Sequence, residues 1–277
     1  MNKSLAGTVG VAGLGTMGLP MAENLSNAGF DVCGFDIRPK HEFPGFQDRF
    51  MENPKEFAAI ADTVISVVRD IKQTLDLCFD DQGLFNGENM PRALVVCSTL
   101  SPKIIPVLER RLPDHVRLVD APMSGAPYRA RSGELTFMVG GDDKDVRPLM
   151  PLFDVMGNQI HHLGGVGSGL ACKVANNFVA CASVVAVRHA LSSAKTLELE
   201  PEALLGVMKT SSGGTWFGDH FHDIDWAKQG YSADNTIAIL EKDLLSFLDG
   251  TDHNETAATD FETAILQSLR RLEPYSC

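Results

Sequence analysis

A glycine-rich turn near the start of the chain constrains the fold more than any other feature of the sequence. The turn at 13–18 (GLGTMG) follows an apolar run over 8–12 and precedes a segment with helical spacing over 19–25. A second apolar run over 31–35 ends at Asp36, eighteen residues after the last glycine of the turn. Strand, glycine turn, helix, strand and acid, in this order, predict a dinucleotide-binding unit.

Each glycine of this turn has its own expected role. Gly13 permits the tight turn, Gly15 lets the backbone approach a pyrophosphate, and Gly18 lets the helix pack closely on the strand. The N-terminus of the helix offers free N–H groups and partial positive charge to the phosphates. A plain turn between a strand and a helix is the alternative, and the surrounding order of elements argues against it. The cofactor contacts predicted in the turn are Gly13, Leu14, Gly15, Thr16 and Met17.

The acid at the end of the second strand indicates which dinucleotide is bound. Asp36 can accept hydrogen bonds from the adenosine ribose hydroxyls, and its charge would repel a 2′-phosphate. The sequence therefore predicts NAD as the cofactor. Arg38 follows two residues later and can pair with such a phosphate, so NADP stays possible.

Composition narrows the class of protein. The chain has 277 residues, enough for one large or two ordinary domains, and a net charge of −12, which argues against nucleic-acid or anionic-membrane binding. Its six cysteines form no CxxC pair and its histidines no HxxxH pattern, so neither disulfides nor a metal site are expected. We expect no signal peptide, no membrane span of about 18 uninterrupted apolar residues, and a cytoplasmic location.

Strand and helix patterns alternate through roughly the first 160 residues. Further strands are predicted at 63–68, 93–97, 116–120 and 135–140, with a helix over 103–111. Such alternation predicts an α/β domain built on a doubly wound parallel sheet.

The pattern changes after His161. A glycine-rich hinge at 164–169 leads into a long helix over 170–197 that is apolar on most sides, and from Pro201 on the chain reads as helical. We therefore predict an NAD-binding Rossmann domain over 1–165. An all-α domain over 166–277, opened by the long interdomain helix, is predicted to follow.

Two polar side chains stand out on the long helix. Lys173 and Asn177 are four residues apart, so they share one face, which we expect where the two domains meet. A partly desolvated lysine there can move a proton to or from a substrate oxygen, and the amide can orient the same oxygen. A solvated lysine is the alternative, and the neighbours Cys172 and Val174 argue against it.

The segment DAPMSGA closes the fifth predicted strand, where ligands bind in sheets of this kind. Ser124, Gly125 and Ala126 offer backbone N–H groups and one hydroxyl, a set that suits a carboxylate. An ordinary loop is an equally good interpretation of this segment. Lys242 lies on a later helix, where an exposed charge cluster with Glu241 and Asp243 is the alternative to a functional role.

Taken together, these motifs resemble the β-hydroxyacid dehydrogenases, the family that contains 3-hydroxyisobutyrate dehydrogenase and tartronate semialdehyde reductase. The resemblance covers nearly the whole chain and rests on four ordered segments, at 13–25, 120–141, 164–177 and 242–244. It implies an oxidoreductase that moves a hydride between a nicotinamide cofactor and a small 3-hydroxy acid or its semialdehyde.

The resemblance also implies individual roles. Lys173 would be the general acid and base, and Asn177 would hold the substrate. Ser124, Gly125 and Ala126 would bind the substrate carboxylate, and Trp216 would line the pocket. The family's cofactor contacts beyond the glycine turn and Asp36 fall on Val68, Arg69, Gln73, Thr99 and Lys242. A homodimer or homotetramer built on the helical domain is implied as well.

The chain departs from the family pattern near the substrate. Ala126 stands where the second glycine of the turn is usual, and Pro127, which lacks an N–H, follows it. The segment 217–222 is unfamiliar and includes His220 and His222. The sequence therefore does not single out 3-hydroxyisobutyrate, and a longer sugar acid of the threonate kind is the alternative substrate.

Two other readings remain. A cofactor-binding sensor or scaffold without catalysis is the alternative of another class, and the presence of both Lys173 and Asn177 argues against it. An imine reductase is weaker still, because those relatives carry a different group at the lysine position.

Overall fold

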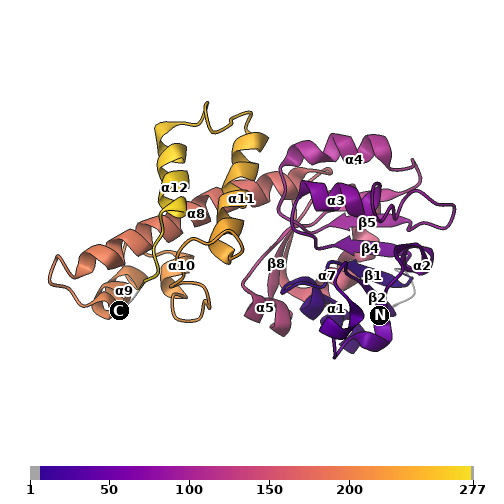
Figure 1. The fold of residues 1–277 in the computed structure, drawn as a ribbon, viewed down its shortest axis with the longest axis horizontal. Coiled ribbons are helices and arrows are strands. Elements are labelled where there is room, and N and C mark those ends of the chain that lie inside the picture. The colour runs from indigo at the N-terminus through magenta and orange to yellow at the C-terminus, as the bar shows by residue number, and fades with distance from the viewer. Residues whose placement is uncertain (1–6, 276–277) are drawn as a thin grey trace. The chain divides into compact units, whose positions relative to one another are not determined.

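The computed structural model describes residues 7–275 and divides after Lys173 into two compact units (Figure 1). The first unit is built of strands and helices, and the second is helical. Residues 1–6, where a signal peptide would begin, lie outside the described residues, and so does Cys277.

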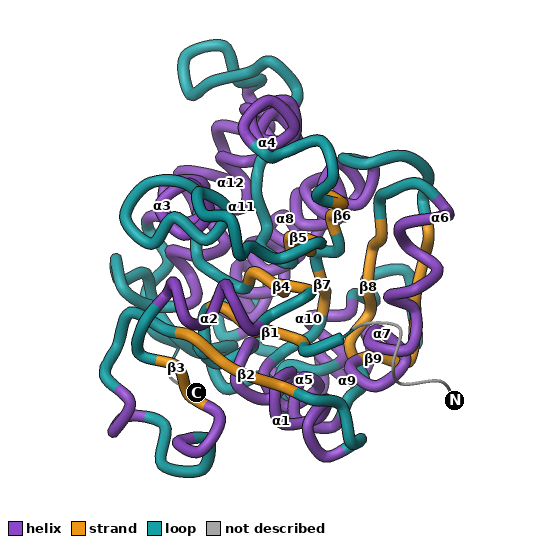
Figure 2. Tube along the Cα trace, turned by 90° about the vertical axis from the view of Figure 1, so that its right-hand side faces the viewer, coloured by secondary structure: helices purple, strands orange, loops and turns teal. Residues whose placement is uncertain are grey.

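A six-stranded sheet of parallel strands forms the centre of the first unit (Figure 2). In sheet order its strands are β3 (Phe50–Met51), β2 (Val32–Phe35), β1 (Val9–Ala12), β4 (Thr63–Ser66), β5 (Ala93–Val96) and β6 (Arg117–Asp120). The central strands are buried along their whole length, because helices cover both faces, and this explains their apolar runs. The order reverses between β1 and β4, and the carboxyl ends of the strands at such a switch point form a crevice.

Helices cover the two faces of this sheet in separate groups. On one face, α1 (Gly18–Asn27), α5 (Pro127–Ser132), α6 (Asp143–Val146) and α7 (Met150–Met156) contribute to one hydrophobic cluster. On the other, α2 (Pro54–Ile60), α3 (Ile71–Cys78) and α4 (Ile105–Arg111) contribute to a second cluster. The predicted doubly wound fold is confirmed, and the helix expected over 103–111 is α4 preceded by a 3-10 turn.

The strand at 135–140 does not join the parallel sheet, so its predicted place is wrong. It is β8 (Leu135–Val139), the middle strand of a separate sheet between β7 (Met123–Ser124) and β9 (Gly157–His162). Only the short helix α5 separates β7 from β8, and the chain turns back so that the two strands pair antiparallel. The sixth strand of the main sheet is β3, whose two residues are too few to give a periodic signal.

The long helix α8 (Ser168–Ala194) begins close to its predicted start and passes from the first unit into the second. It is followed by α9 (Pro201–Lys209), α10 (Trp216–Asp219), α11 (Thr236–Gly250) and α12 (Asp260–Arg270). The predicted boundary at 165/166 differs from the division after Lys173. Hydrogen bonds tie the first turn of α8 to β6, which explains why that turn belongs to the first unit.

By length and composition α8 could cross a membrane, contrary to the expectation from the sequence. It has 27 residues and a mean hydropathy of 1.7 over its most apolar window, of which 39% is buried. Scattered polar residues such as Asn177 and Arg188 hide this from a search for uninterrupted apolar runs. In the second unit, Cys181, Val184 and Leu191 of α8 lie in the hydrophobic cluster of that unit.

A buried arginine of α8 anchors the last described residues of the chain. Arg188 is 3% exposed, and its Nη1 donates to the carbonyl oxygens of Ala227 (2.7 Å) and Gln229 (2.8 Å). Its Nη2 donates to the carbonyl oxygen of Glu273 (2.5 Å), and the guanidinium lies 5.6 Å from the ring centre of Tyr275. This side chain thus ties the C-terminal segment to the loop after α10, together with main-chain bonds from the Tyr231 N–H to the Leu272 oxygen (2.7 Å) and from the Tyr275 N–H to the Lys228 oxygen (2.8 Å).

Candidate active site

The glycine turn packs tightly at both ends and is open in the middle. Gly13 has a φ of +93°, and a Cβ there would lie 2.7 Å from the carbonyl oxygen of Val67. A Cβ at Gly18 would lie 1.9 Å from the carbonyl oxygen of Gly13. A Cβ at Gly15 would meet nothing within 4 Å. This open backbone beside the N-terminus of α1 fits a dinucleotide pyrophosphate.

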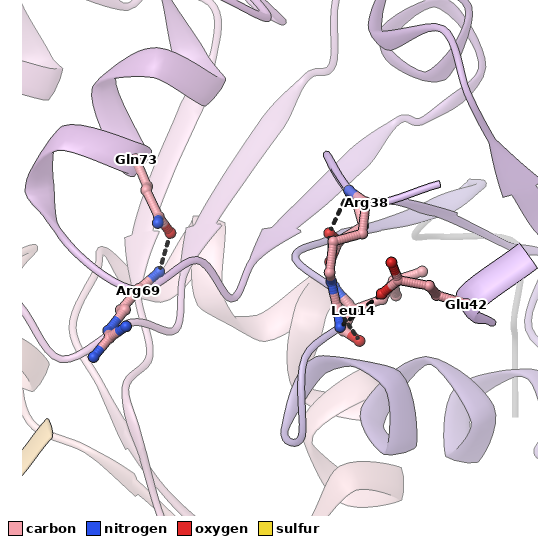
Figure 3. A network of polar contacts seen from close by, with 6 residues as sticks. Leu14, Arg38, Glu42, Arg69 and Gln73 are labelled. Carbon is pink, nitrogen blue, oxygen red and sulfur yellow. Dashed lines mark hydrogen bonds and ion pairs between the residues drawn. The ribbon is translucent and has the colours of Figure 1, made fainter. Parts of the chain in front are cut away.

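Asp36 lies just after β2 and shares its carboxylate between Leu14 and Arg38, two residues that Figure 3 labels. Its Oδ2 accepts the Leu14 N–H at 2.7 Å. The guanidinium of Arg38 donates from Nε to Oδ1 and from Nη2 to Oδ2, both at 3.1 Å, and also from Nη2 to the carbonyl oxygen of Leu14 at 3.0 Å. Burial tends to raise the pKa of Asp36, but the bonds from Arg38 and Leu14 outweigh it and lower that pKa.

The remaining predicted cofactor residues of the first unit follow the carboxyl ends of β4 and β5: Val68, Arg69, Gln73 and Thr99. The Arg69 N–H donates to Gln73 Oε1 at 2.9 Å (Figure 3), and the Gln73 N–H donates to Asp70 Oδ1 at 2.8 Å, which caps α3. Ser98 Oγ donates to the carbonyl oxygen of Val68 at 2.5 Å. The bond from Ser98 joins the loops that follow β4 and β5 at the carboxyl edge of the sheet.

The predicted carboxylate-binding turn follows β7. Ser124 pairs with Thr136 of β8, and Gly125 adopts a φ of +140°. A Cβ at Gly125 would approach Leu135 to 2.9 Å. Ala126 is buried at the start of α5, and Ser124 and Gly125 are half-buried. The alanine in the second glycine position is therefore accommodated as the residue that begins a helix.

The start of α8 is fastened to the end of β6 by a carboxylate to which the sequence assigned no role. Asp120 is fully buried, and it accepts the N–H groups of Gly167 (Oδ1, 2.6 Å) and Leu170 (Oδ2, 2.6 Å). Burial raises the pKa of Asp120, and the bonds from Gly167 and Leu170 oppose that rise. Lys173, which is buried, follows Leu170 by three residues on the same helix.

In the second unit, Asp243 joins two residues that the sequence suggested separately. Asn177 Nδ2 donates to Asp243 Oδ2 at 2.7 Å, and Lys242 Nζ forms an ion pair with Asp243 Oδ1 at 2.7 Å. Asp243 is only 5% exposed, so its interpretation as part of an exposed charge cluster is wrong. Asn177 comes from α8 and the other two from α11, which brings them together across 66 residues of sequence. The only sign of this role in the sequence was the position of Asp243 directly after Lys242.

The unfamiliar segment near Trp216 makes its own local contacts. Trp216 lies on α10, is 45% exposed, and stacks on the ring of His220 at 4.7 Å. His222 Nε2 lies 2.9 Å from Glu202 Oε2 of α9. Both histidines therefore have partners on α9 and α10.

Within residues 7–275, no three His, Cys, Asp or Glu side chains are grouped as they would be to hold a metal ion. The five cysteines in that range are free thiols. Burial raises the pKa of Cys33 and of Cys78 to about 12, so neither thiol ionises near neutral pH.

Comparison with known proteins matches both units. Residues 8–164 match the family described as the NAD binding domain of 6-phosphogluconate dehydrogenase, and residues 167–270 match the NAD-binding domain of NADP-dependent 3-hydroxyisobutyrate dehydrogenase. A 3-hydroxyisobutyrate dehydrogenase of Pseudomonas aeruginosa is 32% identical over 243 residues, 84% of this chain and 81% of the relative. An NAD-dependent L-serine dehydrogenase of the same organism is 32% identical over 244 residues, with 84% and 81% covered.

A solved structure gives the same picture. The 3-hydroxyisobutyrate dehydrogenase of Mycobacterium tuberculosis with L-serine is 26% identical and has a TM-score of 0.75, with 96% of each chain covered.

Proposed function

The chain belongs to the β-hydroxyacid dehydrogenase family, and we propose that Lys173 moves the proton in its reaction on a small 3-hydroxy acid. It is an NAD(P)-dependent hydroxyacid dehydrogenase. The observation that carries the proposal lies within the first unit. There the open turn at Gly15 follows β1, the Ser124 turn comes four residues after the end of β6, and the buried Lys173 lies near the start of α8, which Asp120 at the end of β6 holds.

The nicotinamide, when bound, accepts the hydride from the carbinol carbon or returns it to the aldehyde. Gly15 would admit the pyrophosphate, and the turn at Ser124 and Gly125 would hold the substrate carboxylate through N–H groups and a hydroxyl. Lys173 would take the hydroxyl proton during oxidation and give it back during reduction. Asn177, whose amide is oriented by its bond to Asp243, would hold the reacting oxygen.

The substrate class follows from the groups that such a site recognises. The named relatives are a 3-hydroxyisobutyrate dehydrogenase and an L-serine dehydrogenase, and both named acids carry a primary hydroxyl on the carbon next to the α-carbon. A carboxylate for the Ser124 turn and a hydroxyl for Lys173 are the two shared features. We therefore favour short 3-hydroxy acids with a primary hydroxyl, oxidised with NAD in preference to NADP.

We further propose a cytoplasmic homo-oligomer that uses an apolar surface of the second unit. Val179 of α8 and Phe261 of α12 are each 61% exposed, and Phe178 packs edge-on against Phe261 at 5.9 Å. Apolar surface of this kind favours association with another copy of the chain. Light scattering after size exclusion, with Val179→Glu as the variant, tests it: a monomeric wild type contradicts the proposal.

The proposed reaction is tested by initial rates of oxidation of 3-hydroxyisobutyrate, L-serine and threonate, with NAD and NADP in parallel. Lys173→Ala is expected to lower turnover by about 10²–10⁴-fold, the range for a lost general acid or base, and to leave NADH binding within about twofold. Lys209→Ala, at the exposed end of α9, is the matched control and should behave as wild type. Turnover of Lys173→Ala equal to that of the wild type would contradict the proposed role.

A further inference from the structure

One buried carboxylate connects three elements of the first unit. The side chain of Asp120 accepts N–H groups from Gly167 and Leu170, at the start of α8. Its main chain exchanges two hydrogen bonds with Gly140, which follows β8: Asp120 N–H to the Gly140 oxygen (3.0 Å), and Gly140 N–H to the Asp120 oxygen (2.7 Å). β6, β8 and α8 are therefore joined at a single residue.

Glycines make this junction unusually close. A Cβ at Gly140 would lie 2.4 Å from Asp120 Oδ1 and 2.8 Å from the nitrogen of Gly169. A Cβ at Gly169 would lie 2.2 Å from the carbonyl oxygen of Met138. The first turn of α8 thus touches the backbone at the end of β8 directly, and no side chain separates them.

The N-terminus of α8 is capped by Asp120, which is remote in sequence, although Ser168 is available beside the first turn. Helix N-termini are commonly capped by a Ser, Thr, Asp or Asn beside the first turn, which satisfies orphan N–H groups without fixing the helix to anything else. Ser168 stands at that place, yet its buried Oγ has no hydrogen-bond partner among the described residues. Asp120 comes from 47 residues earlier than Gly167 and both satisfies the N–H groups and holds the helix to the sheet.

The position of Lys173 follows from this anchor. It is three positions after Leu170, less than one turn of a helix that rises about 1.5 Å per residue. The segment that begins at Asp120 also leads within four residues to Ser124 of the substrate turn. The carboxylate of Asp120 therefore holds the start of the helix that carries Lys173, and the same residue precedes the turn expected to hold the substrate.

We infer that Asp120 is a positioning residue for proton transfer: its carboxylate fixes the first turn of α8 to the ends of β6 and β8 and so places Lys173 against the substrate. This inference rests on the proposed function of Lys173. Asp120 does not itself exchange a proton with the substrate, and it acts through the helix. Misplacement by even an ångström is costly for a reacting group, so loss of the anchor reduces the rate of the chemical step.

The test is Asp120→Asn, which keeps the size of the side chain but presents an NH₂ group to one of two N–H donors. We expect kcat to fall ten- to hundredfold, with the KM for NAD within about twofold of wild type. The deuterium isotope effect on kcat, measured with 3-hydroxy acid deuterated at C3, should increase because hydride transfer becomes rate-limiting. A purely structural role would lower the melting temperature without changing this isotope effect.

Glu262→Gln is the matched control. Glu262 is also a buried carboxylate at a helix start, 6% exposed, and its Oε2 accepts the Thr259 N–H at 2.7 Å beside α12. It should lower the melting temperature and leave kcat and the isotope effect unchanged. A folded Asp120→Asn with wild-type kcat overturns the inference.

Gly140→Ala is the second test variant if Asp120→Asn does not fold, because its Cβ displaces the Asp120 carboxylate without removing the charge. A tenfold or greater fall in its kcat supports the inference, and wild-type kcat overturns it. Lys173→Ala is assayed in parallel. Wild-type turnover in that variant contradicts the proposed function itself, whereas an inactive Lys173→Ala beside a wild-type Asp120→Asn contradicts only the positioning role.

Discussion

The guanidinium of Arg38 donates two parallel hydrogen bonds of 3.1 Å each to the carboxylate of Asp36. Bidentate pairing of this kind is among the stronger polar contacts in proteins. Asp36, which is expected to accept hydrogen bonds from the ribose hydroxyls, is therefore paired with Arg38, the residue that could bind a 2′-phosphate. We therefore expect Asp36 and Arg38 to determine the choice between NAD and NADP together.

Removal of the cation should sharpen the preference for NAD. In Arg38→Ala, Asp36 keeps its charge and its bond to Leu14 but loses the group that offsets repulsion of a 2′-phosphate. We expect the KM for NADP to rise about tenfold or more and the KM for NAD to change by less than about threefold. Arg92→Ala is the control, since Arg92 pairs with Asp62 at 3.9 Å on an exposed loop before β5. Equal loss of both cofactors would show that Arg38 does not discriminate between them.

The middle and the last glycine of the turn, Gly15 and Gly18, should respond differently to a single added methyl group. Gly18→Ala places a Cβ 1.9 Å from a backbone oxygen, and overpacking of this kind costs roughly 1–3 kcal/mol of stability. Gly15→Ala meets no protein atom within 4 Å, so we expect normal stability with weaker NAD binding, because the methyl occupies the path of the pyrophosphate. Urea unfolding and NADH fluorescence titration of both variants make the comparison. A stable Gly18→Ala together with unchanged NADH affinity of Gly15→Ala would contradict this account.

Loss of the buried acid in the second unit should impair substrate handling. Asp243→Ala removes the acceptor of the Asn177 amide and the partner of Lys242. We expect kcat/KM for the hydroxy acid to fall about 100-fold, because the amide is no longer held in one orientation. Asp249→Ala, an exposed position on the same helix, is the control and should keep wild-type kinetics. Wild-type kcat/KM in Asp243→Ala would show that this carboxylate does not contribute to the reaction.

The guanidinium of Arg188 is expected to contribute strongly to the attachment of the C-terminal segment. Arg188→Ala leaves the carbonyl oxygens of Ala227, Gln229 and Glu273 without that donor, and we expect a loss of roughly 3 kcal/mol in the free energy of unfolding. Equilibrium unfolding in urea measures it, with the exposed Arg271→Ala as the control. A loss no larger than that of the control would mean that the anchor contributes little.

The ion pair at the cofactor edge also predicts a pH dependence of stability. The pKa of Asp36 is lowered in the folded protein, so its ionised form stabilises the fold above the unfolded pKa of about 3.9. That contribution declines as the pH falls below this value and is lost below the folded pKa. Between pH 5 and pH 2.5, the unfolding free energy of wild type should therefore decrease more than that of Asp36→Asn. Identical pH slopes for the two proteins would contradict the assignment.

Local patterns were sufficient to predict most of the fold. The glycine turn, the apolar strands and the long helix α8 each carry their signal within a few neighbouring residues. The place of β8 does not, because an apolar run of five residues looks the same in a parallel sheet as in a separate mixed one. The direction of the chain between β7 and β8 decides between them, and this depends on tertiary packing.

In the candidate site, too, the residues with a local sequence signal could be predicted, and those with contacts remote in sequence could not. Lys173 and Asn177 are recognisable because helical spacing alone places them on one face. The roles of Asp120 and Asp243 are not, since each depends on a partner about fifty or more residues away. Arg38 was visible as a nearby charge, but its bond to the Leu14 oxygen required the fold.

The continuity of α8 has a consequence for how substrate range can change. The lysine and the amide stand four residues apart on unbroken helix, a rise of about 6 Å, so their spacing is a property of the peptide backbone itself. Substitutions in the segment around Trp216 do not change the spacing of Lys173 and Asn177, because they lie on a different helix. We therefore expect substitutions near Trp216 to change the substrate range while Lys173 and Asn177 keep their spacing.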